Sequence, residues 1–222
     1  MCVVVSTKNT VKIFITPLEA ELDAKFEYRV FYRCSDDCKF YVDYIIKTPK
    51  VAGTAQKDLI MPKLRVQHSY SGDVRYSFMF GAWRQVCSNG MGVMDEERVL
   101  ATKHTKHRLN QTLTKTIESL DDFVARFEEY VKPYKDMQRE VILDVQTRLD
   151  EVIHATKFPI SLREDVLERM RFEKENFGYY NTNWLLYNAM NFQLNHNFDT
   201  FSMQEHNRSK LDAEIFSQLR VS

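Results

Sequence analysis

The sequence has few cysteines, no long apolar run and no net charge, and each shortage excludes a class of protein. Its four cysteines, Cys2, Cys34, Cys38 and Cys87, are too few for a disulfide framework in a chain of 222 residues. No stretch reaches the roughly 18 consecutive apolar residues of a membrane-spanning helix. The N-terminal patch MCVVVSTKNT has no basic region before it and is a poor signal peptide. We expect a cytoplasmic protein with reduced thiols and no membrane partner.

The balance of charge hides an asymmetry along the chain. Lys plus Arg and Asp plus Glu each number 31, but residues 1–110 hold 17 basic and 12 acidic residues, and the remainder holds 14 and 19. The mildly basic first part permits a polyanionic partner without requiring one. A dedicated duplex binder is usually more basic overall.

The first half of the chain has the two-residue periodicity of strands. Apolar and polar residues alternate in VKIFIT (11–16), in FEYRVFYR (26–33) and in KFYVDYII (39–46), and the last two segments flank a polar turn. A second hairpin is predicted from LRVQHSY (64–70) and VRYSFMFGAWRQV (74–86), joined at Ser71-Gly72-Asp73. Residues 48–58 between the hairpins are predicted to form a loop.

From residue 108 onward the spacing becomes helical. Apolar residues recur every three or four positions from Leu109 to Val131, and Pro133 is expected to stop or kink that helix. Further helices are predicted at 137–155, at 161–177 with Ser161 as N-cap and Glu164 completing a capping box, and at 181–196. The whole reads as a single α+β domain: a strand-rich part (1–107) of antiparallel hairpins, then a helix-rich part (108–222) packed on one face.

Three segments in order carry a family resemblance: SYSGDVRYSFMFGAWRQVCSNGM, then KHTKH, then WLLYNAMNFQLNH. Together they resemble the family called domain of unknown function 932, over roughly residues 60–200, and R-x-V-C-S-N-G is the most specific element. The matching positions are Arg84, Cys87, Asn89, Gly90, His107, Asn188, Ala189 and His196. The chain departs from the pattern at Asn191, where a threonine is expected. The resemblance implies a phage- or plasmid-like origin, hence a host-cell cytoplasm, and implies no activity.

The end of the apolar run 78–83 holds the first candidate site. In one interpretation Arg84 pairs with a carboxylate beneath the helices, Cys87 is a small buried side chain, and Asn89-Gly90 makes a turn. In the other, Arg84, Ser88 and the amides flanking Gly90 form a concave nest for phosphate. A nucleophilic Cys87 assisted by His104 or His107 is the third and weakest reading.

The segment KHTKHR (103–108) is the second candidate. It is either a solvated basic connector or a patch that contacts phosphates. His104 and His107 could bind a metal ion together with Cys87, but zinc sites usually show a clearer second pair of ligands. We therefore assign no metal, cofactor or catalytic residue. The predicted nucleic-acid interface consists of Arg84, Ser88, Asn89, Gly90, Lys103, His104, Lys106, His107 and Arg108.

Aromatic residues crowd the strands, with basic residues between them. Because side chains alternate between faces, some rings must point away from the helices, where they would either stack on single-stranded bases or fill a core or subunit interface. The sequence favours a mobile-element protein that binds nucleic acid, single-stranded rather than duplex, in replication or recombination and without catalysis. The alternative is a phage counter-defence protein that contacts a host protein. Either form is compatible with a homo-oligomer.

Overall fold

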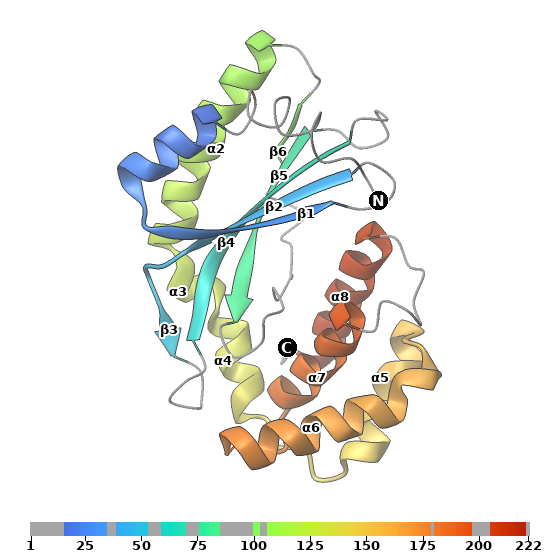
Figure 1. Ribbon diagram of the computed structural model, residues 1–222. Helices are drawn as coiled ribbons and strands as arrows, with labels where there is room; N and C mark the ends of the chain where they lie inside the picture. The colour runs from blue at the N-terminus through green and yellow to red at the C-terminus, as the bar shows by residue number, and fades with distance from the viewer. Residues whose placement is uncertain are drawn as a thin grey trace. The chain divides into compact units, whose positions relative to one another are not determined.

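The computed structural model describes residues 16–34, 39–52, 59–69, 76–84, 100–102, 106–178, 180–196 and 205–220 (Figure 1). The strand-then-helix order expected from the sequence is confirmed, and the fold is α+β. The strands are β1 (Tyr28–Cys34), β2 (Lys39–Ile46), β3 (Val51–Ala52), β4 (Leu59–Ser69), β5 (Tyr76–Arg84) and β6 (Leu100–Thr102).

The strands form one sheet in the order β1-β2-β4-β5-β6, with β3 pairing beside β4. The pairs β1–β2, β2–β4, β3–β4 and β5–β6 are antiparallel. The first hairpin is as predicted, and β2 matches its predicted range exactly at both ends, 39 and 46. β4 begins five residues earlier than predicted, directly after the segment 48–58 that is expected to be a loop, and that segment contains β3.

The helices after the sheet are shorter and more numerous than the apolar spacing suggests. They are α2 (Lys106–Ala125), α3 (Phe127–Tyr130), α4 (Lys132–Arg139), α5 (Val145–Thr156), the 3₁₀ turn η2 (Ile160–Leu162), α6 (Arg163–Phe177), α7 (Asn183–His196) and α8 (Glu205–Leu219). Residues 16–25 form a further helix ahead of the sheet, which the sequence analysis does not anticipate. Thr16, predicted as the end of a strand, belongs to that helix, and the rest of that strand lies outside the described residues.

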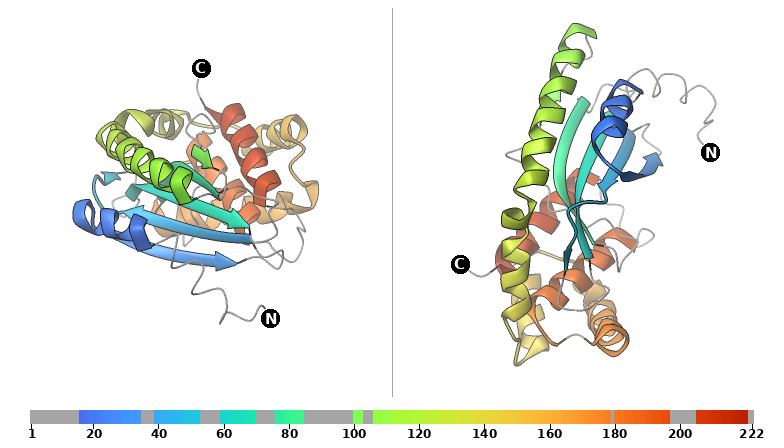
Figure 2. Two further views of the ribbon diagram at one scale, coloured as in Figure 1. Left: turned by 90° about the horizontal axis from the view of Figure 1, so that it is seen from above. Right: turned by 90° about the vertical axis from the view of Figure 1, so that its left-hand side faces the viewer.

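The chain divides into two compact units whose segments interleave. The sheet unit comprises Met1–Lys50, Met61–Gly81 and Asp95–Phe127, and the helical unit comprises Val51–Ile60, Ala82–Met94 and Glu128–Ser222. Helix α2 therefore belongs with the strands, although it lies in the predicted helix-rich part. Figure 2 shows α2 running along the sheet.

In the sheet unit, the residue register sorts the side chains onto two faces. The pairing of Val30 with Tyr44 and of Tyr44 with Leu64 places these three on one face. His68 of β4 shares that face and its ring lies 5.8 Å from that of Tyr76, so alternation along β5 puts Phe80 there too. Tyr44 donates a hydrogen bond to Glu19 of the 16–25 helix, at 3.3 Å, and the Phe80 ring lies 5.4 Å from that of Phe123 in α2. Both helices thus cover the same, apolar face.

In the helical unit, α4, α7 and α8 meet around a buried aromatic cluster. The ring of Tyr134 lies 5.6 Å from Trp184 and 5.1 Å from Phe216, and Tyr187 lies 5.7 Å from Phe216. Tyr187 also donates to the buried carboxylate of Asp212 at 3.2 Å. The pKa of Tyr187 is raised well above its ordinary value, first by burial and then by the Asp212 charge.

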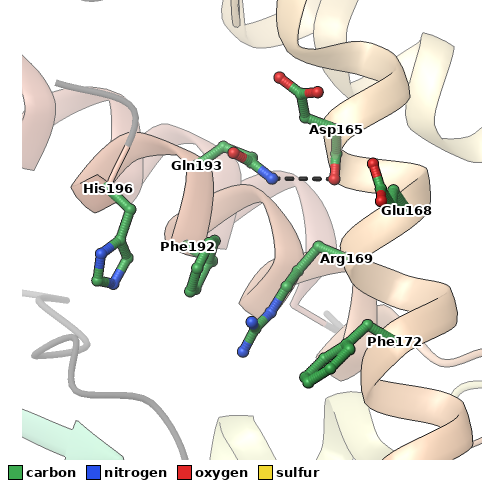
Figure 3. Close-up of a pocket in the computed structure, with 7 residues that line it drawn as sticks. All are labelled: Asp165, Glu168, Arg169, Phe172, Phe192, Gln193 and His196. Carbon is green, nitrogen blue, oxygen red and sulfur yellow. Dashed lines mark hydrogen bonds between the residues drawn. The ribbon is translucent and has the colours of Figure 1, made fainter. Parts of the chain in front are cut away.

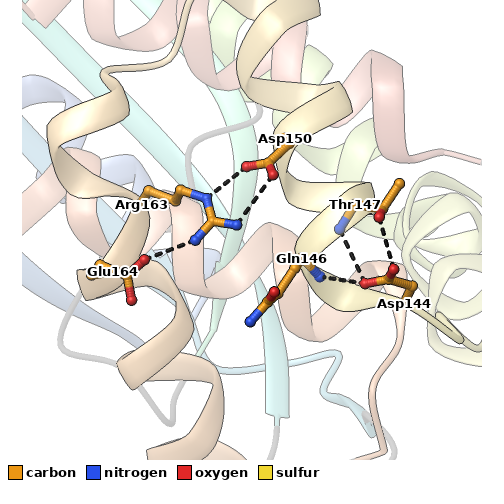
Figure 4. Close-up of polar contacts among 6 residues, drawn as sticks. All are labelled: Asp144, Gln146, Thr147, Asp150, Arg163 and Glu164. Carbon is orange, nitrogen blue, oxygen red and sulfur yellow. Dashed lines mark hydrogen bonds and ion pairs between the residues drawn. The ribbon is translucent and has the colours of Figure 1, made fainter.

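The edge of the helical unit is held by caps and ion pairs (Figure 4). Asp144 begins α5 by accepting hydrogen bonds from the backbone of Gln146 and Thr147, both at 3.1 Å. Arg163 donates two hydrogen bonds to the Asp150 carboxylate, at 2.6 and 3.1 Å, and so joins the start of α6 to α5. The predicted capping box is wrong, because Ser161 lies inside η2 and Leu162 occupies the N-cap of α6 without a side-chain bond.

Candidate nucleic-acid interface

The other register face of the sheet unit carries polar and charged side chains, most of them buried, in contrast to the apolar face beneath the helices. The members of this polar face are Arg29, Phe31, Tyr41, Asp43, Lys63, Arg65 and Gln67, and the apolar Ile45 lies among them. Alternation along β1, β2 and β4 dictates this set, since each of these residues lies one position from an apolar neighbour on the other face. The sequence analysis anticipates such a basic and aromatic face from the pattern of the strands.

At the centre of this polar face, the charged side chains bind one another. Arg65 and Asp43 are direct cross-strand partners, and the guanidinium binds the carboxylate through two bonds of 2.6 and 2.9 Å. The Arg65 charge also lies 5.8 Å from the ring of Tyr41. Lys63 is fully buried. These residues hold the strands together and are not offered to a ligand in solution.

The edge of the polar face is open. Arg29 is exposed, and Phe31 beside it on β1 has 41% of its surface exposed. Tyr32, on the other face of the same edge strand, is 63% exposed and donates its hydroxyl to Glu19 at 3.0 Å. Burial raises the pKa of Tyr32 to about 12, with the bond to Glu19 adding to it.

Most of the aromatic platform predicted from the sequence is core instead. The buried rings are Tyr41, Tyr44, Tyr76, Phe78, Phe80 and Trp83. Several of them pack on one another, as Tyr76 and Phe78 do at 5.0 Å. The core interpretation is thus confirmed for these residues, and the surface available for stacking narrows to Phe31 and Tyr32 on β1.

Arg84 is the one residue of the R-x-V-C-S-N-G element within the described part of the chain. Its side chain is 1% exposed and binds Glu173 of α6, Nη1 to Oε2, at 3.1 Å. The guanidinium also lies 5.6 Å from the Trp184 ring. The predicted pairing of Arg84 with an acid from the helices is confirmed. Because the Arg84 charge is buried and paired with Glu173, this residue contributes to the fold. The prediction of a phosphate contact therefore rests on the other residues.

The remaining predicted interface residues fall in two groups. Ser88, Asn89, Gly90, Lys103 and His104 lie outside the described residues, as does Cys87, so the proposed loop and the cysteine–histidine reading are not placed. Lys106, His107 and Arg108 form the beginning of α2. The apolar spacing predicts a helical part from residue 108, whereas the backbone begins the helix at Lys106 and so includes Lys106 and His107 as well.

The start of α2 has an unusual charge pattern. Negative side chains are favoured at a helix N-terminus, where the backbone dipole and the unbonded N–H groups are positive. The first turn of α2 contains no acidic residue and begins with Lys106, His107 and Arg108. This end of the helix therefore concentrates positive charge, which costs a little helix stability and favours a bound anion.

The asparagines of the last family segment have a structural role. Asn188 donates to the Trp184 carbonyl at 2.6 Å, and Asn191 donates to Asp212 of α8 at 2.7 Å. Asn195 donates to the Asn191 carbonyl at 2.8 Å. Asn191, which replaces the threonine of the family pattern, thus ties α7 to α8.

These features belong to a family whose activity is not defined. The family model described as domain of unknown function (DUF932) matches residues 4–215, nearly the whole chain, and the chain belongs to that family. No curated protein and no solved structure matches it. Among the residues that the structure describes, no helix is long and apolar enough to cross a membrane.

Proposed function

We propose that the chain binds nucleic acid, single-stranded in preference to duplex, through its sheet unit and without catalysis. The setting we propose is replication or recombination of a phage-like element in the host cytoplasm, with the chain acting alone or as a homo-oligomer. The observation that carries the proposal is the first turn of α2, where three basic residues stand at the positive end of a 20-residue helix. Phosphate is one of the anions that such an end binds, and Lys103 and His104 precede it in the sequence.

The exposed rings of the edge strand β1 favour single-stranded nucleic acid over duplex. Stacking of bases on aromatic rings requires bases that are free of a partner strand. Phe31 and Tyr32 are the exposed rings on β1, and exposed Arg29 shares the polar face with Phe31. Exposed rings and basic groups are the two kinds of contact that sequence-tolerant single-strand binding uses. Tyr32 is the exposed ring on the face that α2 covers, and Phe31 lies on the opposite face of β1.

The test is fluorescence anisotropy with a labelled oligothymidylate across a salt series. Three phosphate contacts predict a log–log salt slope of about −2, at roughly 0.7 per contact on a single strand. Replacing Lys103, Lys106 and Arg108 with Ala should weaken binding and flatten the slope. The matched control replaces Arg139, Arg171 and Lys174, three exposed basic residues of the helical unit, and should change neither. Absence of binding at low salt, or equal effects of the two triple variants, would reject the proposal.

A protein–protein role is the second candidate, and one feature favours it. Val141, Leu143 and Tyr180 are 64%, 99% and 79% exposed, and Val141 forms an isolated bridge with Thr182, close in sequence to Tyr180. Large apolar side chains so exposed suit a docking surface better than a phosphate site. A pull-down of one host protein that survives high salt and is lost in a Leu143→Asp variant would favour this role.

A further inference from the structure

A row of four planar side chains crosses a groove between α6 and α7 (Figure 3). The guanidinium carbon of Arg169 lies 3.8 Å from the Phe192 ring centroid and 5.1 Å from that of Phe172. His196 stacks on Phe192 at 4.2 Å with 27° between the ring planes. The order along the row is His196, Phe192, Arg169, Phe172. The groove has a volume of about 560 Å³, within the range of sites for small ligands.

Two hydrogen bonds hold the row in place. Nε of Arg169 donates to the fully buried carboxylate of Glu173 at 2.9 Å, which fixes the plane of the guanidinium. Gln193 joins the two helices by donating to the Asp165 carbonyl at 2.9 Å. Spacings of three and four residues on α6 and α7 bring the members of the row side by side. A site ordered before binding loses less entropy when a ligand arrives.

The ends of the row are exposed while its middle is covered. Phe172 has 47% of its surface exposed, and His196 is exposed at the other end. Phe172 also contacts Phe177, whose ring centroid lies 6.3 Å away at an interplanar angle of 78°. The part of Phe172 that stays exposed offers a planar group apolar surface to bury. The groove therefore suits a flat aromatic ligand.

The polar groups of the groove decide which flat ligand fits. Asp165 and Glu168 line it, and an ionised carboxylate only accepts hydrogen bonds. Asp165 and Glu168 outnumber Arg169 among the side chains that line the groove, which disfavours a phosphate. A ligand must bring N–H donors on the edge of an aromatic ring, as nucleobases do. Guanine presents adjacent ring and amino N–H groups, which match the two oxygens of one carboxylate.

We propose that this groove binds a nucleobase by stacking on Phe172, with guanine preferred because Glu168 accepts its N–H groups. The base belongs either to a free nucleoside or to an exposed position of a strand, and the chemistry is shared by both. The inference does not rest on the proposed function, because every residue that carries it lies in the helical unit.

The test is calorimetric titration of the full chain with guanosine, 1-methylguanosine, uridine and guanosine monophosphate. Guanosine should bind tightest, the methylated nucleoside should lose most of the preference, and the phosphate should add nothing. Phe172→Ala should weaken guanosine binding about tenfold or more. Glu168→Gln should reduce the preference for guanosine over 1-methylguanosine. Tyr180→Ala, which removes a still more exposed ring outside the groove, is the control and should change nothing.

A second titration separates the two sources of the base. Binding of free guanosine that Phe172→Ala weakens supports a small-molecule site. If only a guanine-containing oligonucleotide binds, and Phe172→Ala weakens that binding, the base belongs to a strand. No saturable binding of either ligand, or binding indifferent to Phe172→Ala and to Phe172→Leu, overturns the inference. The triple Ala variant at 103, 106 and 108 should leave guanosine binding intact, so failure of one proposal is distinguishable from failure of the other.

Discussion

The two units bury ionic groups in different ways. In the sheet unit one carboxylate meets one guanidinium: Asp43 and Arg65 form a two-bonded pair, each at most 4% exposed. In the helical unit Glu173 serves two arginines, Arg84 at 3.1 Å and Arg169 at 2.9 Å. The first group is neutral as a pair, whereas the second carries an excess positive charge among its three members.

The difference explains where aromatic rings lie in the helical unit. A buried excess charge needs compensation, and the faces of aromatic rings supply it. Arg84 lies over Trp184, and Arg169 lies between Phe192 and Phe172. The same arrangement that compensates Arg169 builds the stacked row of the groove. The sheet unit contains a contact of the same kind, between the Arg65 charge and the ring of Tyr41 at 5.8 Å, and places most of its rings in an apolar core.

The largest expected effect is the loss of the shared carboxylate. Glu173→Gln leaves two guanidinium groups near each other without their anion, and should lower the free energy of unfolding by about 3–5 kcal/mol. Arg84→Met removes one charge and keeps Glu173 paired with Arg169, so it should cost less. Urea denaturation of both variants tests the order. An Arg84→Met variant less stable than Glu173→Gln would contradict the assignment of Glu173 as the centre of the group.

Asp43→Asn should have the next largest effect, of about 3 kcal/mol, because it leaves only one buried guanidinium uncompensated. Removing both charges, in Asp43→Asn with Arg65→Met, should recover part of the loss. The same denaturation series measures it. If the double variant is no more stable than Asp43→Asn alone, the two residues do not act as a pair.

A smaller effect is expected at the surface, where a carboxylate caps a helix rather than filling an interior. The side-chain hydroxyl of Thr147 and the backbone N–H groups of α5 hold the pKa of Asp144 below its ordinary value. The stability contributed by this residue is therefore present above the unfolded pKa, near 3.9, and is lost as the pH falls through the lower folded pKa. Asp144→Asn should be less stable than the parent chain at pH 7, and the gap should narrow on acidification. A gap independent of pH would show that the charge has no part in the cap.

The sequence predicts the sheet hairpins and the partner type of Arg84 because both follow from local patterns. Alternation fixes the strand faces, and a charge beyond an apolar run implies a buried acid. The helix at 16–25 has a sequence signal as well, because Thr16, Pro17 and Glu19 have the spacing of a capping box with proline in the first turn. Helix α8 repeats apolar residues at Leu211, Ile215 and Leu219.

Other features could not be read from the sequence, since they depend on contacts between distant segments. Glu173 is one of several acids on an amphipathic helix, and nothing local marks it as the one that meets Arg84, 89 positions away. The stacked row likewise needs the relative placement of α6 and α7. The family pattern singles out His196, whereas no pattern in the sequence marks Arg169 or Phe172 of the same row.

Amide hydrogen exchange with and without oligothymidylate is the most direct test of the proposed function. The first N–H groups of a helix have no partner within it and exchange readily unless an anion binds them. The account predicts that the oligonucleotide slows exchange at residues 106–109, the first turn of α2, and leaves residues 141–143 of the helical unit unchanged. Unchanged exchange at 106–109 under conditions where the oligonucleotide is bound would contradict it.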